Sequence, residues 1–331
     1  MLSGVLSVAV VVVIFYGLFR GTDLAEVGRA IGDMTGIELA GLLAVALWNL
    51  ASYWLVLVCV LPGLSTAQAG VSSLTSTAIS NTAPAGAAFG IGVTYAMYVS
   101  WGFAPRAVTL SVLVSGVWNS FVKLGMPVVA LAFLAAQGDA GAGRLTAALA
   151  GVGALVVVVV VFALMLRSEA VARRVGDGAG AVVSGVVRLF RRGPVTGWGD
   201  AAVGFRAQTI ELLEGRWPVL TLVTVVSHLS LYVVLLVSLR HIGVSEDEVG
   251  WAEILAAFAF VRLLTALPIT PGGAGVVELA LTAALVLAGG DRELVVAAVL
   301  VFRILTYLLP IPLGAVTYVV WRRRQGWRHP A

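Results

Sequence analysis

The sequence predicts an all-α polytopic membrane protein with six full spans and two re-entrant helical hairpins, arranged as an inverted repeat with both termini in the cytoplasm. Of its 331 residues, 60% are hydrophobic and 11% are charged, whereas about 25% are charged in soluble domains. Apolar runs long enough to cross a hydrocarbon core of about 30 Å recur along the whole chain. Arginines gather in two segments, as they do in cytoplasmic loops. We therefore expect one integral membrane domain over residues 1–331.

Six uninterrupted apolar runs predict the full spans. The first could resemble a cleaved signal peptide, but no basic residue precedes it and no small-residue cleavage site appears before Asp23. We therefore interpret it as a retained span. The six runs are Leu2–Phe19, Leu39–Leu61, Val108–Ala136, Thr146–Leu166, Trp217–Leu239 and Leu294–Trp321.

Two further apolar stretches, at about 72–101 and 251–288, are broken by Pro, Gly and polar residues and could each be a kinked span or a hairpin. If both crossed fully, the basic segment 167–216 and the basic tail would face opposite sides. If both are hairpins, these segments face the cytoplasm together, which fits the preference of arginine for that side. The segment 167–216 holds Arg167, Arg173, Arg174, Arg188, Arg191, Arg192, Arg206 and Arg216, and the tail holds Arg322, Arg323, Arg324 and Arg328.

This arrangement makes the units at about 39–136 and 217–321 inverted copies, each with a span, a hairpin and a span. The hairpin tips are similar, with Thr82-Ala83-Pro84-Ala85-Gly86 in one unit and Thr270-Pro271-Gly272-Gly273 in the other. Paired interrupted helices in inverted repeats indicate a transporter site near the membrane midplane. The alternative is that Gly and Pro are simply common in membrane helices.

Four charged residues fall inside apolar stretches: Lys123, Arg262, Glu278 and Arg303. Each costs roughly 2.5–3.5 kcal/mol at a helix centre, so we expect them to face partners or a wet cavity. Arg262 and Glu278 lie at similar depth on two limbs of one hairpin, and they either form a structural ion pair or act directly. The excess of cations over carboxylates suits a phosphate-bearing ligand.

Weaker signals surround this set. The Gly272-Gly273-Ala274-Gly275 turn, after Pro271, opens a helix whose free N–H groups favour an anion. We expect polar side chains in apolar runs to hydrogen-bond between helices. We expect the basic cluster near residue 190 to form a helix that lies on an anionic inner leaflet. The pattern predicts no metal site, no cofactor and no nucleic-acid partner. These polar residues are Asn81, Asn119 and His228, with Pro84 and Gly86 at the first tip, and the basic cluster is Arg188, Arg191 and Arg192.

The segment Leu267–Glu278 contains P-x-T-P-G-G-x-G-x-x-E. It resembles the signature of the lysylphosphatidylglycerol synthase transmembrane family, the flippase-like proteins. Arg303-Ile304-Leu305-Thr306-Tyr307-Leu308-Leu309-Pro310, with Gly314, resembles the last-span pattern of that family, which adds Tyr307 to the candidate site. Many members carry charges around the first tip, whereas this sequence has none there.

The resemblance implies movement of phospholipids, or of related lipid-linked headgroups, between the leaflets of the cell membrane. In fused relatives a soluble aminoacyltransferase domain follows the membrane part, and we expect no synthase activity here because the sequence ends at Ala331. Our hypothesis is that Lys123, Arg303 and the Gly272–Gly275 amides hold a headgroup phosphate. Glu278 and Arg262 would then set the hairpin or exchange partners.

Two alternatives come from other functional classes. A lipid-linked glycosyltransferase would need an acidic catalytic residue in an outer loop, and the segment before the second span offers candidates. A non-transporting subunit would use the basic segment 167–216 to dock a separate enzyme. The acidic candidates are Asp23, Glu26, Asp33 and Glu38.

Overall fold

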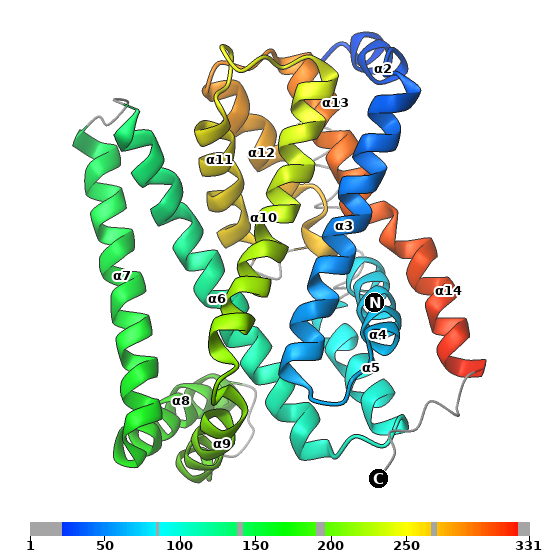
Figure 1. Cartoon of the computed structure of the whole chain (residues 1–331). Coiled ribbons are helices and arrows are strands. Elements are labelled where there is room, and N and C mark those ends of the chain that lie inside the picture. Colours follow the sequence, from blue (N-terminus) through cyan, green and yellow to red (C-terminus); the bar gives the residue numbers. More distant parts are fainter. Residues whose placement is uncertain (1–21, 84–85, 138–141, 190–195, 266–269, 324–331) are drawn as a thin grey trace.

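The computed structural model describes residues 22–83, 86–137, 142–189, 196–265 and 270–323, and all regular structure within them is helical (Figure 1). The predicted all-α class is confirmed for these residues. Four of their helices are long and apolar enough to cross a membrane: Gly36–Val60, Pro105–Ala136, Trp217–Ile242 and Arg292–Arg323. The first predicted span, Leu2–Phe19, lies outside the described residues.

Five helical segments run between the two ends of the molecule (Figure 1). Each contains one of the predicted apolar runs, extended by capping residues at its ends. Thr35 and Glu38 form a capping box at the start of the first, for example, which places its beginning three residues before the apolar run. The segments are α3 (Gly36–Val60), α6 (Pro105–Ala136), α7 (Ala142–Arg167), α10 (Trp217–Ile242) and the continuous α13 (Arg292–Arg303), η2 (Ile304–Leu308) and α14 (Pro310–Arg323).

The first broken stretch forms a hairpin of α4 (Thr66–Thr82) and α5 (Gly86–Ser100). It extends from the lower end of Figure 1 toward the middle of the molecule. The two helices approach closely because Gly86 and Gly90 face Ser80, where a Cβ atom at either position would collide with Ser80. The hairpin begins earlier than the predicted stretch at about residue 72, because Ser65 and Gln68 form a capping box that starts α4 at Thr66.

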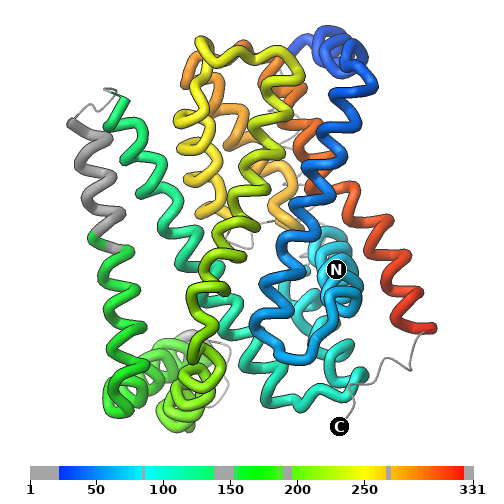
Figure 2. The backbone as a smooth tube through the Cα atoms, in the orientation of Figure 1, coloured from blue at the N-terminus to red at the C-terminus, as the bar shows by residue number. Residues whose placement is uncertain are grey.

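The second broken stretch forms a hairpin that extends from the upper end of Figure 1 toward the middle. It consists of α11 (Trp251–Leu264), the short turn η1 (Pro271–Gly273) and α12 (Val276–Leu287). At its upper end the Glu253 carboxylate accepts a hydrogen bond of 2.9 Å from the Gly250 N–H, which caps α11. The two hairpins therefore approach each other tip to tip (Figure 2).

The last segment supports both hairpins. Residues 295–299 of α13 are almost entirely buried, and α13 packs against α10, α12 and α2. The Leu309 N–H bonds to the Ile304 carbonyl, five residues back, at 2.8 Å and closes the π turn η2. Pro310, which follows, has no N–H to donate. Below that turn, Gly314 lies against the backbone of Leu74, so that α14 packs along α4.

Three amphipathic or polar helices lie at the two ends of the bundle, and the sequence analysis expected a helix in only one of these segments, around Arg188. α2 (Leu24–Gly32) is at the upper end, and α8 (Glu169–Leu189) and α9 (Trp198–Leu213) are at the lower end. Arg173 joins the latter two through Asp200, a hydrogen bond that raises the pKa of the guanidinium. Arg188 is exposed on α8, whereas Arg191 and Arg192 lie outside the described residues.

Candidate functional site

A cavity of about 700 Å³ lies where the two hairpin tips meet. Its walls come from the ends of α4 and α5, the middle of α6 and α10, and the α11, η1, α12, α13 and η2 segments. The sequence analysis named nine of the lining residues: Lys123, Arg262, Pro271, Gly272, Gly273, Arg303 and Tyr307, together with Asn81 and Gly86 from the first tip.

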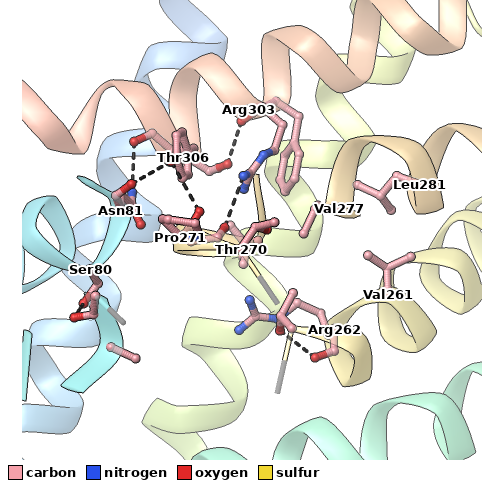
Figure 3. A pocket seen from close by; sticks show the side chains of 18 of the residues that line it. Ser80, Asn81, Val261, Arg262, Thr270, Pro271, Val277, Leu281, Arg303 and Thr306 are labelled. Carbon is pink, nitrogen blue, oxygen red and sulfur yellow. Dashed lines mark hydrogen bonds between the residues drawn. The ribbon is translucent and has the colours of Figure 1, made fainter. Parts of the chain in front are cut away.

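Arg303 and Glu278 form a buried ion pair beside this cavity. The Arg303 Nε donates to Glu278 Oε1 at 2.8 Å, and the two side chains are only 12% and 4% exposed. A second guanidinium nitrogen of Arg303 donates to the Gly272 carbonyl at 3.2 Å, and the guanidinium lies 4.4 Å from the centre of the Tyr307 ring. Figure 3 shows Arg303 extending from its helix toward the tip residues Thr270 and Pro271. Arg303 thus fixes the second tip to the last segment.

The possible ion pair between Arg262 and Glu278 is absent, and this reading was wrong. Equal depth on two limbs fixes the height of each side chain but not the direction in which it points around its helix. Glu278 on α12 points toward α13 and bonds to Arg303, whereas Arg262 on α11 faces the cavity. Within the part of the chain that the structure describes, the Arg262 side chain has no hydrogen-bond or ion-pair partner, although its Nε is buried.

The cavity therefore carries surplus positive charge. Lys123 on α6 also lines it, and the Arg262 guanidinium lies within electrostatic range of both Lys123 and Arg303. Glu278 is the one carboxylate among the charged residues of the apolar stretches, and it is already bonded to Arg303. Such groups are too costly at this depth to remain without a compensating anion or water.

The glycine-rich tip adopts a backbone that only glycine accommodates easily. Gly272, Gly273 and Gly275 have positive φ values of 56°, 72° and 81°. Two tip amides are used inside the turn, because Gly273 N–H bonds to the Thr270 carbonyl and Ala274 N–H to the Pro271 carbonyl, both at 3.1 Å. The tip is thus less open to an anion than the sequence pattern implied, and Gly275 does not line the cavity. The start of α12, which no side chain caps, remains available to an anion.

Hydrogen bonds hold the two tips together through Tyr307. Its hydroxyl donates to the Asn81 carbonyl at 2.7 Å and lies 3.4 Å from the Pro271 carbonyl. In return, Asn81 Nδ2 donates to the Tyr307 carbonyl at 3.0 Å. A Cβ atom on Gly272 would collide with the Tyr307 ring, so the tip and the ring are in close contact. We call these contacts of Asn81, Tyr307 and Pro271 the tip latch.

The helix-to-helix role predicted for the apolar-run polar residues is confirmed. The Asn119 Oδ1 on α6 accepts a 3.0 Å hydrogen bond from His228 Nε2 on α10, and Asn81 joins α4 to η2. Asn119 and His228 do not line the cavity, and Pro84 lies outside the described residues. Sequence reasoning did not name Ser80 or Thr265, and it quoted Thr270 and Thr306 as parts of motifs without assigning them to the site, although all four line the cavity.

Two of the four acidic residues offered for glycosyl transfer, Asp23 and Glu38, have structural roles at the upper end of the molecule. Asp23 caps α2 by accepting from the Ala25 and Glu26 N–H groups, and Glu38 completes the capping box of α3. Among the described residues, no group of three or more His, Cys, Asp or Glu side chains could hold a metal ion.

Comparison with known proteins places these features in a family. A sequence model described as "Lysylphosphatidylglycerol synthase TM region" matches residues 4–314 of the 331, a range that includes both hairpins and every cavity residue. No curated protein matches the chain. The match extends over nearly the whole sequence and agrees with the motif around Pro271. The chain therefore belongs to the lysylphosphatidylglycerol synthase transmembrane region family.

Proposed function

We propose that this protein moves a phosphate-bearing lipid headgroup between the two leaflets of the cell membrane. Membership of the family indicates a membrane protein of lipid metabolism or transport. The observation that carries the more specific proposal is the cavity with surplus positive charge at the meeting point of two hairpin tips. A phosphate supplies the negative charge that this site lacks, and the acyl chains can remain in the bilayer.

The proposed topology has six spans, two re-entrant hairpins and both termini in the cytoplasm. In support, the order long helix, hairpin, long helix occurs twice, in α3 to α6 and in α10 to α14, and the two hairpins extend from opposite ends of the bundle (Figure 1). On this proposal, the lower end with α8 and α9 faces the cytoplasm, where Arg188 would lie on anionic lipid. The two halves then form an inverted repeat, an arrangement found in many transporters that work by alternating access.

Cysteine labelling checks the topology. In a Cys59→Ser background, we expect Val182→Cys on α8 and Arg323→Cys at the end of α14 to react with a membrane-impermeant maleimide from the cytoplasmic side. Ile37→Cys and Leu287→Cys, whose native side chains are 86% and 88% exposed, should react from the opposite side. Labelling of Val182→Cys and Arg323→Cys from different sides would contradict the topology.

In the proposed mechanism, Lys123 and Arg262 attract the headgroup phosphate into the cavity, and Arg303 with the start of α12 holds it. Glu278 keeps Arg303 oriented while the site is empty. When the phosphate is bound, it competes with Glu278 for Arg303, and Glu278 can turn toward Arg262. Passage to the other leaflet requires the tip latch to open, because Tyr307 bonds to both hairpins at once.

A transport assay tests the proposal. With the full-length protein reconstituted in vesicles, a fluorescent phosphatidylglycerol analogue in the inner leaflet should reach the outer leaflet faster, where added dithionite bleaches it. Lys123→Gln should slow this bleaching by about tenfold or more, because a charge contact to phosphate is lost. The matched control is Arg106→Gln, which removes one charge from an exposed position on the same helix. Equal transport by wild type and Lys123→Gln would remove the proposed site.

A further inference from the structure

We infer that the cavity selects headgroups that carry two negative charges and no ammonium group. This inference deepens the proposed function and rests on it. The family name refers to a lysylated headgroup, which has two ammonium groups and one phosphate. The charges around this cavity disfavour such a headgroup.

The first step is the charge balance of the cavity. Lys123, Arg262 and Arg303 line it, and Glu278 balances one of these three cations through its ion pair. The tip segments that the structure does not describe, 84–85 and 266–269, contain no ionisable side chain in the sequence. Two positive charges are therefore left for a ligand to neutralise.

The second step concerns where those two charges lie. Arg303 already has Glu278, the Gly272 carbonyl and the Tyr307 ring as partners. Lys123 and Arg262 form no ion pair with any residue in the described ranges, and they lie close enough to repel each other. The Arg262 Nε is buried without a hydrogen-bond partner in the same ranges. A doubly charged ligand removes this repulsion, whereas a singly charged one leaves one cation unbalanced.

The third step concerns which groups in the cavity could bind an ammonium group. Proteins bind such groups with carboxylates or with the faces of aromatic rings. The Glu278 side chain is 4% exposed and bonded to Arg303, and the Arg303 guanidinium already covers the ring of Tyr307. The other two aromatic residues of the lining, Phe258 and Phe302, are only 2% and 3% exposed. An ammonium group in this cavity would therefore lie among like charges, which costs binding energy.

Two kinds of lipid carry the required charge. A phosphomonoester has both negative charges on one phosphate, because its second pKa is about 6, and a lipid with two phosphodiesters has one on each. The cavity of about 700 Å³ has room for either headgroup. The shared requirement is two negative charges.

Competition binding to the purified full-length protein tests the inference. At pH 7, native mass spectrometry would compare four lipids, namely phosphatidic acid, cardiolipin, phosphatidylglycerol and lysylphosphatidylglycerol. We expect phosphatidic acid or cardiolipin, or both, to bind about tenfold more tightly than phosphatidylglycerol, and lysylphosphatidylglycerol to bind weakest. Preference for phosphatidic acid alone identifies a single phosphomonoester, and preference for cardiolipin alone identifies paired phosphodiesters. Equal binding of phosphatidylglycerol and both doubly charged lipids, or tightest binding of lysylphosphatidylglycerol, would overturn the inference.

Variants assign the preference to the cavity. Arg262→Gln should reduce it to about twofold or less, while Arg262→Lys, which keeps the charge, and Arg106→Gln, which changes an exposed position, should retain it. If Arg262→Gln does not fold, Lys123→Gln makes the same test. A preference unchanged in the cavity variants would contradict the inference. Its failure is distinguishable from failure of the proposed function, because transport that still depends on Lys123 would leave that function in place.

Discussion

Arg303→Ala is expected to abolish lipid transport and to destabilise the protein by about 3–5 kcal/mol, the usual cost of leaving one member of a buried ion pair without its partner. The variant removes the hydrogen bonds to Glu278 and to the Gly272 carbonyl and the contact with Tyr307. Glu278 would then remain as an unpaired carboxylate in a side chain that is 4% exposed. The second tip would also lose its attachment to the last segment.

Further variants separate stability from function. Glu278→Gln should be less destabilising, because the amide oxygen can still accept a hydrogen bond from Arg303, but it should alter transport. The double variant Arg303→Met with Glu278→Leu should recover much of the stability, since neither charge is then buried alone, and it should remain inactive. Unfolding by sodium dodecyl sulfate and the vesicle assay measure the two effects. Normal transport by the double variant would exclude a role for the pair in the lipid path.

Gly314→Leu is expected to cause the second large effect, a loss of about 1–3 kcal/mol in stability together with loss of transport. Gly314 is in close contact with the Leu74 backbone of α4, and even a Cβ atom would collide with it and with Ala78. A leucine would force α14 away from the first hairpin. Tyr307, about two turns of helix earlier in the same segment, would then be drawn away from Asn81.

The control for this variant is Gly116→Leu. Gly116 lies in α6, a helix with similar apolar surroundings, and a Cβ atom there meets no other atom within 4 Å. We expect this variant to unfold at the same detergent concentration as the wild type, or at a slightly higher one, because leucine favours helix over glycine. Equal behaviour of the two leucine variants would show that close packing of α14 on α4 does not matter.

The positions of the apolar helices followed directly from the sequence, because unbroken runs such as Val108–Ala136 leave few alternatives in a bilayer. The helix ends differ by a few residues, since capping groups such as Thr35 and Ser65 begin helices outside the apolar runs. The helices α2 and α9 were missed because their mixed polar composition resembles that of loops. For α8, the sequence predicted a helix only around the basic cluster at Arg188, whereas the helix already begins at Glu169.

The candidate site was predicted in composition but not in pairing. The free-energy cost of placing a charge in a membrane-spanning helix was enough to single out Lys123, Arg262, Glu278 and Arg303, because charges in apolar runs are rarely incidental. Which of the two arginines would bind Glu278 depends on the rotation of α12 about its axis, and no residue count gives that angle. The tip latch was equally hidden, because Asn81 and Tyr307 are 226 residues apart in the sequence.

The π turn at Ile304–Leu308 determines which face of α14 packs against α4. A π turn holds one residue more than an α turn, which offsets all later side chains by about 100° around the helix axis. Deleting one residue there would keep the segment helical but would present a different stripe of α14 to α4, with Gly314 turned aside. This one extra residue thus sets the angular register by which one half of the molecule meets the other.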